Sequence, residues 1–362
     1  MRHSSVIRSS AILSAALCAV LAQPASAAVI GVVAPTSGPY VRLGEQIRHG
    51  ASAAVGDGNQ IVVVPETCEP GSGKQVAEQL KTQGVSIAIG FLCVETLTDA
   101  LPALKGTGMP AITVSVRSRI LSEDAQRHGW SFFRVAPAEG QEAAAISDII
   151  LGRWQNQPIA LIDDGTIYAR DLIAAVRSRI EAGGIKPVFV DTFRPGQEQQ
   201  LSLVRRLAKA GAARVIVGGD RTDIAVMARD AEKDGAKLTF VGGDVMRAAN
   251  RPVSLPEGVM AVALPDFSKE VDADGAVSIL RVAGIDPDGY TLPAYAAVQV
   301  AEKALAAARQ GNLSLTDALR RETVASVIGP IDFTENGELK QNLFQLQSWR
   351  TNGWALEAAQ TE

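Results

Sequence analysis

The chain has 362 residues, of which 35 are basic and 39 acidic, so its formal net charge at pH 7 is −4. A mildly acidic balance argues against a nucleic-acid-binding protein and against attachment to an anionic membrane surface. At this length we expect two domains, and a hydrophobic content of 47% is enough to form two buried cores.

The first 27 residues have the three parts of a secretory signal peptide. Arg2 and Arg8 precede an apolar stretch over residues 11–22, and a small-x-small cleavage site ends at Ala27. The apolar stretch is about 12 residues, which is too short for a membrane-spanning helix of ~20 residues. We therefore expect cleavage after Ala27 and export out of the cytoplasm. Without its two arginines, the mature chain from Ala28 carries a net charge of −6.

Three cysteines occur in the chain, and each has a different expected fate. Cys18 lies in the signal peptide; lipidation is the alternative, but Leu17 stands where a lipoprotein signal has a small residue. Cys68 and Cys93 remain after export. An even pair in an oxidising compartment favours a disulfide, and the alternative is two buried free thiols.

From Ala28 onward, short apolar strands alternate with helical stretches. The expected strands are 28–34, 61–64, 85–89 and 109–114, and the expected helices are 44–55, 74–83 and 96–105. This alternation is typical of βαβ units, whose parallel sheet is covered on both faces.

The same alternation begins again after Pro137. The expected strands are 159–162, 187–190, 215–217 and 238–241, and the expected helices are 169–181, 199–209 and 223–234. The sequence thus predicts an α/β protein with two doubly wound parallel-sheet lobes joined by a hinge.

The C-terminal tail, which starts near Pro265, follows two complete sheets. It contains expected helices at 292–309 and 315–321 and an expected strand at 343–349. We expect the tail to cross back and add to both lobes. The predicted division is 28–136 with 266–344 for lobe 1, and 137–265 with 345–362 for lobe 2.

The tetrapeptide Val-Gly-Gly-Asp ends two neighbouring strands of the second lobe and places Asp220 and Asp244 after them. Ligands of open parallel sheets bind beyond the carboxyl ends of the strands, so both aspartates are candidate site residues. The alternative is a helix N-cap. That alternative suits Asp220 better than Asp244, because residues 245–256 show no clear helical pattern.

The residue clusters that enzymes need are missing from the sequence. The mature chain has two histidines, His49 and His128, which are far apart in sequence, and it has no H-E-x-x-H, C-x-x-C or G-x-S-x-G motif. No G-x-G-x-x-G follows the first strand. We therefore expect a protein that is not an enzyme and that carries no metal and no cofactor.

Six segments resemble the periplasmic branched-chain amino-acid-binding proteins, which are receptors of ABC transporters with the type I periplasmic binding fold. The resemblance lies in residues 31–40, 43–50, 67–70, 89–93, 289–297 and 327–333. It covers nearly the whole mature chain, but its motifs are specific for the superfamily rather than for a ligand.

For lobe 1, the resemblance implies a ligand carboxylate held by backbone N–H groups and a serine after the third strand. The matching stretch here has Cys93 and Val94 and lacks that serine. Backbone N–H groups of the helix that follows can still bind an anion. After the fourth strand, the family's small residue and threonine are matched by Ser115 and Arg117.

For lobe 2, the resemblance implies an aromatic residue at Tyr168, and Asp220 stands where the family has a second tyrosine. Asp244 matches the family's acidic residue for the ligand ammonium. Tyr40, in the first loop of lobe 1, is expected to stack on the ligand or to line the mouth of the cleft.

Arg117 has two candidate roles. Its guanidinium can hold a ligand carboxylate in a two-pronged geometry. Alternatively, it forms a salt bridge to Asp220, Asp244 or Glu95 that latches the closed lobes.

The resemblance implies a solute-binding protein of an ABC importer that takes an amino acid or a similar small carboxylate between its lobes. The expected partners are the small-molecule ligand and an ABC permease in the inner membrane, with no nucleic acid, and the protein is expected to be a monomer. The alternative is a ligand sensor or signalling receptor of the same fold without a role in transport. The absence of another attached domain favours transport.

Overall fold

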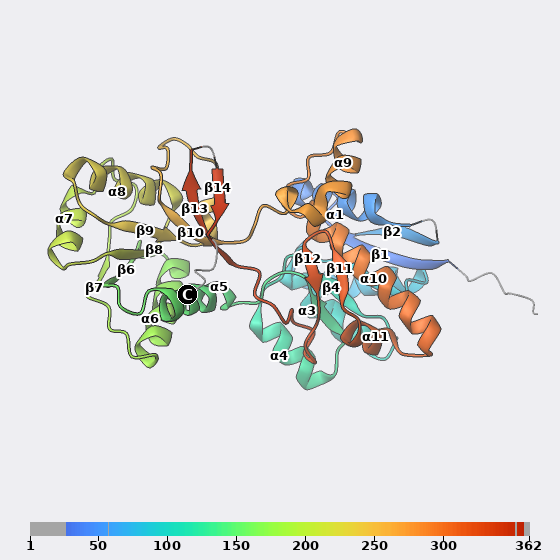
Figure 1. Ribbon diagram of the computed structural model, residues 1–362. Coiled ribbons are helices and arrows are strands. Elements are labelled where there is room, and N and C mark those ends of the chain that lie inside the picture. Colours follow the sequence, from blue (N-terminus) through green and yellow to red (C-terminus); the bar gives the residue numbers. More distant parts are fainter. Residues whose placement is uncertain (1–26, 57, 352, 358–362) are drawn as a thin grey trace, which may run out of the picture.

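The computed structural model describes residues 27–56, 58–351 and 353–357. The expected signal peptide, apart from Ala27, and Cys18 therefore lie outside the described residues. The described chain forms two α/β lobes, each built on its own sheet (Figure 1). No helix within the described ranges is long and apolar enough to cross a membrane.

Lobe 1 contains a parallel sheet with the strand order β2-β1-β3-β4-β5. Its strands are β1 (Ala28–Ala34), β2 (Asn59–Pro65), β3 (Ile87–Gly90), β4 (Ala111–Thr113) and β5 (Phe132–Arg134). Its helices are α1 (Val41–Ala54), α2 (Gly73–Thr82), α3 (Val94–Leu104), α4 (Arg119–His128), α9 (Asp274–Val282), α10 (Thr291–Gly311) and α11 (Leu315–Arg321). The short 3₁₀ turns η2 (Phe267–Lys269) and η3 (Val271–Ala273) precede α9, and the antiparallel hairpin β11 (Val324–Ser326) and β12 (Gly329–Ile331) completes the lobe.

Lobe 2 contains a seven-stranded sheet with the order β14-β13-β10-β9-β8-β6-β7. Its strands are β6 (Ile159–Asp163), β7 (Phe189–Thr192), β8 (Arg214–Gly218), β9 (Thr239–Gly242), β10 (Met260–Ala263), β13 (Gln345–Arg350) and β14 (Gly353–Leu356). Its helices are α5 (Gln141–Arg153), α6 (Ile167–Ala182), α7 (Leu201–Lys209), α8 (Arg221–Asp234) and the 3₁₀ turn η1 (Asp244–Arg247). The pairings are parallel from β7 to β10, and β13 and β14 add in antiparallel orientation.

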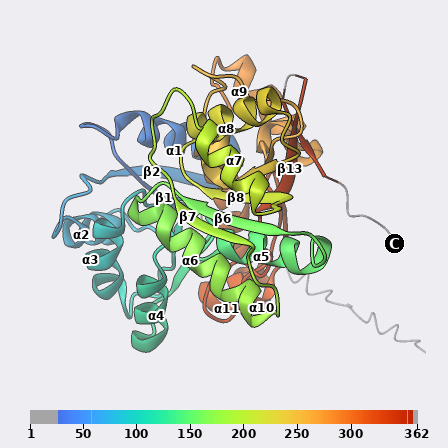
Figure 2. The ribbon, with the colours of Figure 1, turned by 90° about the vertical axis from the view of Figure 1, so that its left-hand side faces the viewer.

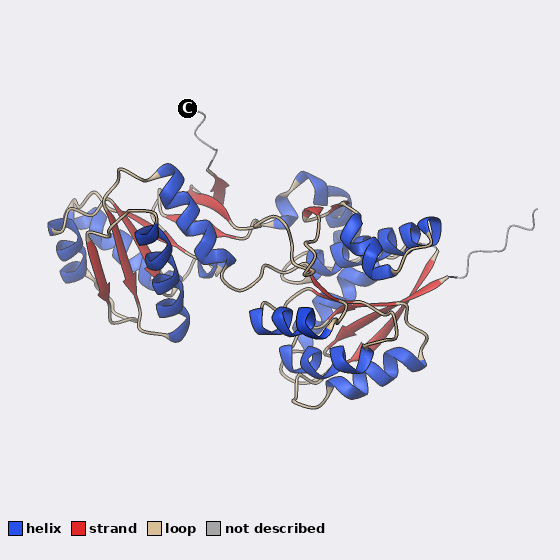
Figure 3. Cartoon of the chain, turned by 90° about the horizontal axis from the view of Figure 1, so that it is seen from below, coloured by secondary structure: helices blue, strands red, loops and turns tan. Residues whose placement is uncertain are grey.

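The central strands of each sheet, such as β1, β3, β6 and β8, are buried on both faces, which explains why they are apolar runs rather than alternating. In lobe 1, Val32 contributes to the core on the side of α1 and α10, and its neighbour Val33 to the core beside α2 and α3. In lobe 2, Ile162 packs on the side of α7 and α8, and Leu161 on the side of α5 and α6. Figure 3 shows helices on both sides of the strands in both lobes.

The chain passes between the lobes three times: between β5 and α5, between β10 and α9, and between β12 and β13. The second of these passages and the third run side by side, because β10 and β13 are antiparallel neighbours. Seen from the end of lobe 2, α6, α7 and α8 lie in front, and lobe 1 extends behind them (Figure 2). These passages form the hinge region beside the candidate site.

The predicted fold class is confirmed, and every strand and helix expected from the pattern is present within a few residues. The sequence did not predict α4, β5, α5, α9, β10, β14 or the β11–β12 hairpin. Several of these elements leave only a weak pattern in the sequence, because they are short or largely exposed. β5 has three residues, and most residues of α4 are exposed. After Asp244, residues 245–256 contain only the end of the single turn η1, in agreement with the missing helical pattern.

Candidate functional site

The candidate residues all follow the carboxyl ends of parallel strands, which is where open α/β sheets bind ligands. In lobe 1 they follow β1, β3 and β4, and in lobe 2 they follow β6, β8 and β9. The structure connects some of these loops directly and leaves others apart.

Arg117 of lobe 1 and Asp244 of lobe 2 form an ion pair beside the hinge. Nη2 of Arg117 lies 3.3 Å from Oδ2 of Asp244, and the other carboxylate oxygen accepts the N–H of Leu264 at 3.0 Å. The guanidinium also lies 5.8 Å from the ring centroid of Phe344. Leu264 and Phe344 belong to the crossing segments, so the pair is attached to the hinge itself.

Glu142, at the start of α5, is the buried acid of this cluster. Its carboxylate accepts the Tyr168 hydroxyl at 2.9 and 3.0 Å and the Asp244 N–H at 2.7 Å. A Cβ at Gly243 would lie 2.0 Å from Glu142 Oε1, so only glycine allows this approach.

Burial raises the pKa of the Glu142 carboxyl, while the Asp244 N–H and the Tyr168 hydroxyl oppose that rise. Burial and the neighbouring Glu142 raise the pKa of the Tyr168 phenol, so it keeps its proton and donates. Arg117 supplies the positive charge that faces both carboxyls.

Arg117, Glu142 and Tyr168 line a cavity of about 490 Å³ between the hinge and α6, and Asp244 contacts them from outside its lining. Its wall combines charged groups with an apolar surface, as small-molecule sites generally do. The lining consists of Arg117, Ala138, Glu139, Gly140, Glu142, Ala143, Tyr168, Asp171, Leu172, Ala175 and Phe344.

The turn after β3 forms the lobe-1 edge and has a constrained backbone. Phe91 has a φ of +55°, a left-handed conformation that is rare for a bulky residue and costs about 1–3 kcal/mol. Its N–H donates to Val33 O at 2.8 Å, and its carbonyl accepts the Thr113 hydroxyl at 2.9 Å. Neighbouring strands therefore hold the turn in a fixed shape.

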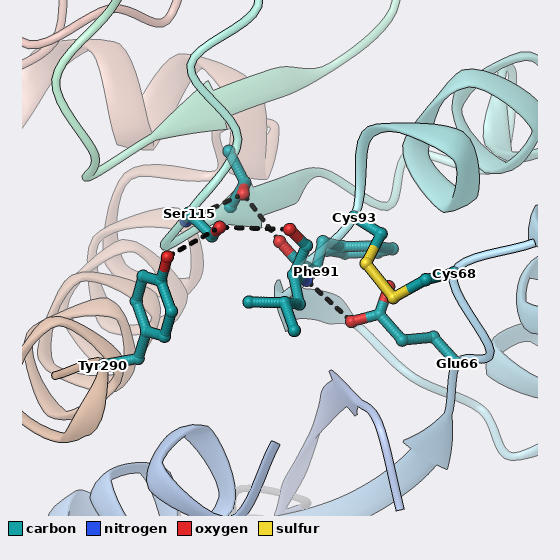
Figure 4. Close-up of a disulfide and its surroundings, with 8 residues drawn as sticks. Glu66, Cys68, Phe91, Cys93, Ser115 and Tyr290 are labelled. Carbon is teal, nitrogen blue, oxygen red and sulfur yellow. Dashed lines mark hydrogen bonds between the residues drawn. A yellow bond between two sulfur atoms is a disulfide. The ribbon is translucent and has the colours of Figure 1, made fainter. Parts of the chain in front are cut away.

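Ser115 extends this network toward the opening of the lobe. Its hydroxyl donates to the Leu92 carbonyl at 3.0 Å and lies 3.2 Å from the Tyr290 hydroxyl (Figure 4). Leu92 also donates its N–H to the buried Glu66 carboxylate at 2.6 Å. Leu92 is thus held at its N–H by Glu66 and at its carbonyl by Ser115.

The predicted disulfide is present between Cys68 and Cys93, whose Cα atoms are 5.3 Å apart. Cys93 occupies the N-cap position of α3 without a capping side-chain hydrogen bond, so the bridge fixes the start of that helix. Glu66, Cys68 and Cys93 lie close enough together to suggest a metal site. The two sulfur atoms are bonded to each other, however, and offer no thiolate ligand.

Tyr40, Val94 and Asp220 remain apart from these clusters. Within residues 27–56, 58–351 and 353–357, no hydrogen bond or ion pair links their side chains to the other candidates. Tyr40 is 45% exposed at the N-cap of α1. Asp220 caps α8 by accepting the Thr222 N–H at 2.7 Å, which is the alternative considered for it from the sequence.

Asp220 also lines a larger groove of about 830 Å³ between residues 196–201 and α8. All of the residues that line this groove belong to lobe 2. The smaller cavity, which contains Arg117 of lobe 1, is the better candidate for the site.

The comparisons with known proteins agree with this architecture. Residues 28–353 match the family model described as periplasmic binding protein. The chain belongs to the periplasmic binding protein family. A curated relative, the Leu/Ile/Val-binding protein homolog 3 of Brucella melitensis, is 25% identical over 336 residues, covering 88% of this chain and 90% of that protein.

Solved structures with the fold of this periplasmic binding protein include an ABC transporter substrate-binding protein from Desulfitobacterium hafniense in complex with Leu. It has a TM-score of 0.63 and 18% identity, covering 91% of this chain and 99% of that one. A solute-binding protein from R. palustris in complex with benzoate has a TM-score of 0.61 and 18% identity, covering 91% and 95%.

Among the residues of the candidate site that the sequence did not predict in this periplasmic binding protein are Glu142, Tyr290 and Phe344. Nothing in the sequence indicated Glu142, because its partners Tyr168 and Asp244 lie in α6 and η1, which follow other strands. Tyr290 lies in one of the segments that carry the resemblance, but only the fold brings it to Ser115.

Proposed function

We propose that the protein is the solute-binding component of an ABC importer and that it captures an amino acid or a similar small carboxylate between its lobes. The observation that carries this proposal is the site beside the hinge. Arg117 from lobe 1 meets Asp244 and the Glu142–Tyr168 pair from lobe 2 at the edge of a cavity of about 490 Å³.

The two sides of the site have complementary chemistry. Lobe 1 offers donors to an anion: the backbone at the start of α3 and the Arg117 guanidinium. Ser115 holds the Leu92 carbonyl beside them. Lobe 2 offers the aromatic ring of Tyr168 and the carboxylate of Asp244. The proposed ligand-binding residues are Tyr40, Cys93, Val94, Ser115, Arg117, Tyr168, Asp220 and Asp244.

Similar proteins support this ligand class. The relative from Brucella melitensis is named a Leu/Ile/Val-binding protein homolog, and structures of the same fold hold Leu or benzoate. A carboxylate beside an apolar group is common to these ligands. Arg117 stands where the family has threonine. A positive charge in place of a hydroxyl favours a ligand that presents an anionic group to this position.

Binding would proceed by hinge bending. The lobes would be 28–136 with 266–344, and 137–265 with 345–362, and they would close on the ligand as rigid bodies. The closed form would then dock on the permease. The mature protein would begin at Ala28 and act in the periplasm as a monomer, without a cofactor and without turnover of its ligand.

A thermal-shift screen of L-amino acids and small organic acids tests the proposal. A ligand at 100 times its dissociation constant adds ~2.7 kcal/mol of stability. Titration calorimetry on each hit should then give one site per chain, and the recovered ligand should be chemically unchanged. The proposal fails if no amino acid or carboxylate in the screen stabilises the protein.

A further inference from the structure

Glu66 is a buried acid directly beneath the lobe-1 edge of the candidate site. It follows β2, it is 2% exposed, and its Oε1 accepts the Leu92 N–H at 2.6 Å. In the described part of the chain, its Oε2 has no hydrogen-bond partner, and neither has the fully buried hydroxyl of Thr96 on α3. Figure 4 shows the carboxyl beside the disulfide.

The surroundings of Glu66 favour a protonated carboxyl. Burial is the largest cause and raises the pKa of Glu66 to about 7, while the Leu92 N–H, the nearby Thr96 hydroxyl and the Cys93 N–H oppose it. Glu95 on α3 is the charged neighbour, and it raises the pKa further. Cys68 and Cys93 do not titrate because they are bridged, and no described cation forms an ion pair with Glu66.

Leu92 connects this buried carboxyl to the surface of the site. Its N–H donates to Glu66, and its carbonyl accepts the Ser115 hydroxyl, which lies beside Tyr290. The next residue, Cys93, begins α3. A change in the charge of Glu66 therefore acts on the backbone segment that faces an anion bound at the start of that helix.

We propose that Glu66 is a positioning residue for the lobe-1 edge of the ligand site and that its protonation couples ligand affinity to pH. This inference rests on the proposed function, because it requires a carboxylate ligand near residues 92–94. An ionised Glu66 repels that carboxylate through the short segment between them. Bound ligand thus favours protonated Glu66, and by linkage the affinity falls as the pH rises through the pKa of Glu66.

Glu66→Gln separates the charge from the geometry. The amide keeps an oxygen for the Leu92 N–H and places a donor toward Thr96, but it cannot ionise. Asp230→Asn is the matched control. Asp230 is also 2% exposed and also accepts one backbone N–H, that of Gln200, at 2.6 Å. It differs from Glu66 in lying in lobe 2 and in being paired with Arg229.

The measurement is titration calorimetry of the mature protein with L-leucine and with benzoate at pH 5.5 and 8.5. Between pH 5.5 and 8.5, we expect the affinity of the wild type and of Asp230→Asn to fall by on the order of tenfold more than that of Glu66→Gln. The pH dependence that remains in Glu66→Gln comes from other groups of the site, such as Glu142. A second readout needs no variant. In buffers of different ionisation enthalpy near pH 7, binding to the wild type should take up a fraction of a proton.

The outcomes separate the two proposals. If a probe binds but Glu66→Gln has the same pH dependence as the wild type, or the wild type takes up no proton, the role of Glu66 is overturned and the proposed function stands. If neither probe binds at either pH and no carboxylate in the thermal-shift screen binds either, both proposals are overturned. A carboxylate that does bind in the screen takes the place of the two probes in the same titrations. If Glu66→Gln does not fold, the absence of proton uptake by the wild type still overturns the role of Glu66.

Discussion

Nη2 of Arg117 lies 3.3 Å from Oδ2 of Asp244, so a side chain from the β4 loop of one lobe is paired with a side chain from the end of β9 in the other. The second oxygen of Asp244 accepts the Leu264 N–H, which belongs to a crossing segment. Both oxygens of the acid are therefore engaged before any ligand arrives. A ligand carboxylate would share Arg117 with Asp244, or would replace it as the partner.

Arg117→Ala tests whether this arginine binds ligand or only latches the lobes. The paired side chains are 42% and 25% exposed, so their loss should lower the free energy of unfolding by ~1 kcal/mol or less. Affinity for the carboxylate identified in the screen should fall at least about tenfold, because a charge-assisted contact is removed. Chemical denaturation and titration calorimetry measure the two effects.

The control for Arg117→Ala is Arg119→Ala. Arg119 lies two residues further on, pairs with Glu123 on α4, and is 64% exposed. It removes the same charge from the same region, so its affinity should match that of the wild type. If Arg117→Ala also binds as tightly as the wild type, Arg117 is only a latch between the lobes.

Tyr168→Phe removes a donor from the buried Glu142 carboxylate and should cost ~1–3 kcal/mol of folding free energy. The Tyr168 hydroxyl lowers the pKa of Glu142, which burial raises. Without that donor the pKa rises further. The loss should be small at low pH, where Glu142 is protonated in both proteins, and should grow as the pH rises and the wild-type carboxyl ionises.

Urea denaturation at two pH values, one below and one above the ionisation of the wild-type Glu142 carboxyl, measures this difference. Tyr40→Phe serves as the control. Because Tyr40 is 45% exposed, the loss of its hydroxyl should change the free energy of unfolding by the same small amount at both pH values. A Tyr168→Phe penalty that is equal at the two pH values would show that the hydroxyl does not act through the charge of Glu142.

The Cys68–Cys93 bridge should stabilise the fold because it closes a loop and so lowers the entropy of the unfolded chain. Its cysteines are 25 residues apart, and the loop-entropy model gives ~3 kcal/mol for a loop of this size. Cys68→Ser with Cys93→Ser should lose about that amount in chemical denaturation. Alkylation and mass spectrometry of the exported wild type should find neither cysteine free; a modified Cys68 or Cys93 without reduction would contradict the bridge.

The fold could be read from the sequence because its signals are local. Strands such as Ala28–Ala34 are continuous apolar runs, and helices such as α7 have a strongly amphipathic pattern, so periodicity alone identifies them. Elements such as β5 were missed because a three-residue strand has no period to detect. Its place in the sheet comes from pairing with β4.

The candidate site was only partly predictable because its contacts are not local. Strand ends and the resemblance pointed to Arg117 and Asp244, and the sequence named their pairing as one possible role for the arginine. Neither could reveal that Glu142, 102 residues from Asp244, would accept its N–H. The burial that raises the pKa of Glu66 is likewise a property of the packed lobe rather than of its neighbours in sequence.

Ligand binding should close the two lobes. The chain crosses between them three times, and two of these crossings flank the antiparallel pair β10 and β13, so the expected motion is a rotation about these segments. Small-angle scattering of the mature protein should show the radius of gyration falling when ligand is added. Arg117→Ala serves as the control, at a ligand concentration that lies below the dissociation constant of this weaker variant. Its radius of gyration should stay at the value of the ligand-free protein. An unchanged radius for the wild type at a saturation verified by calorimetry would show that the solute binds without hinge closure.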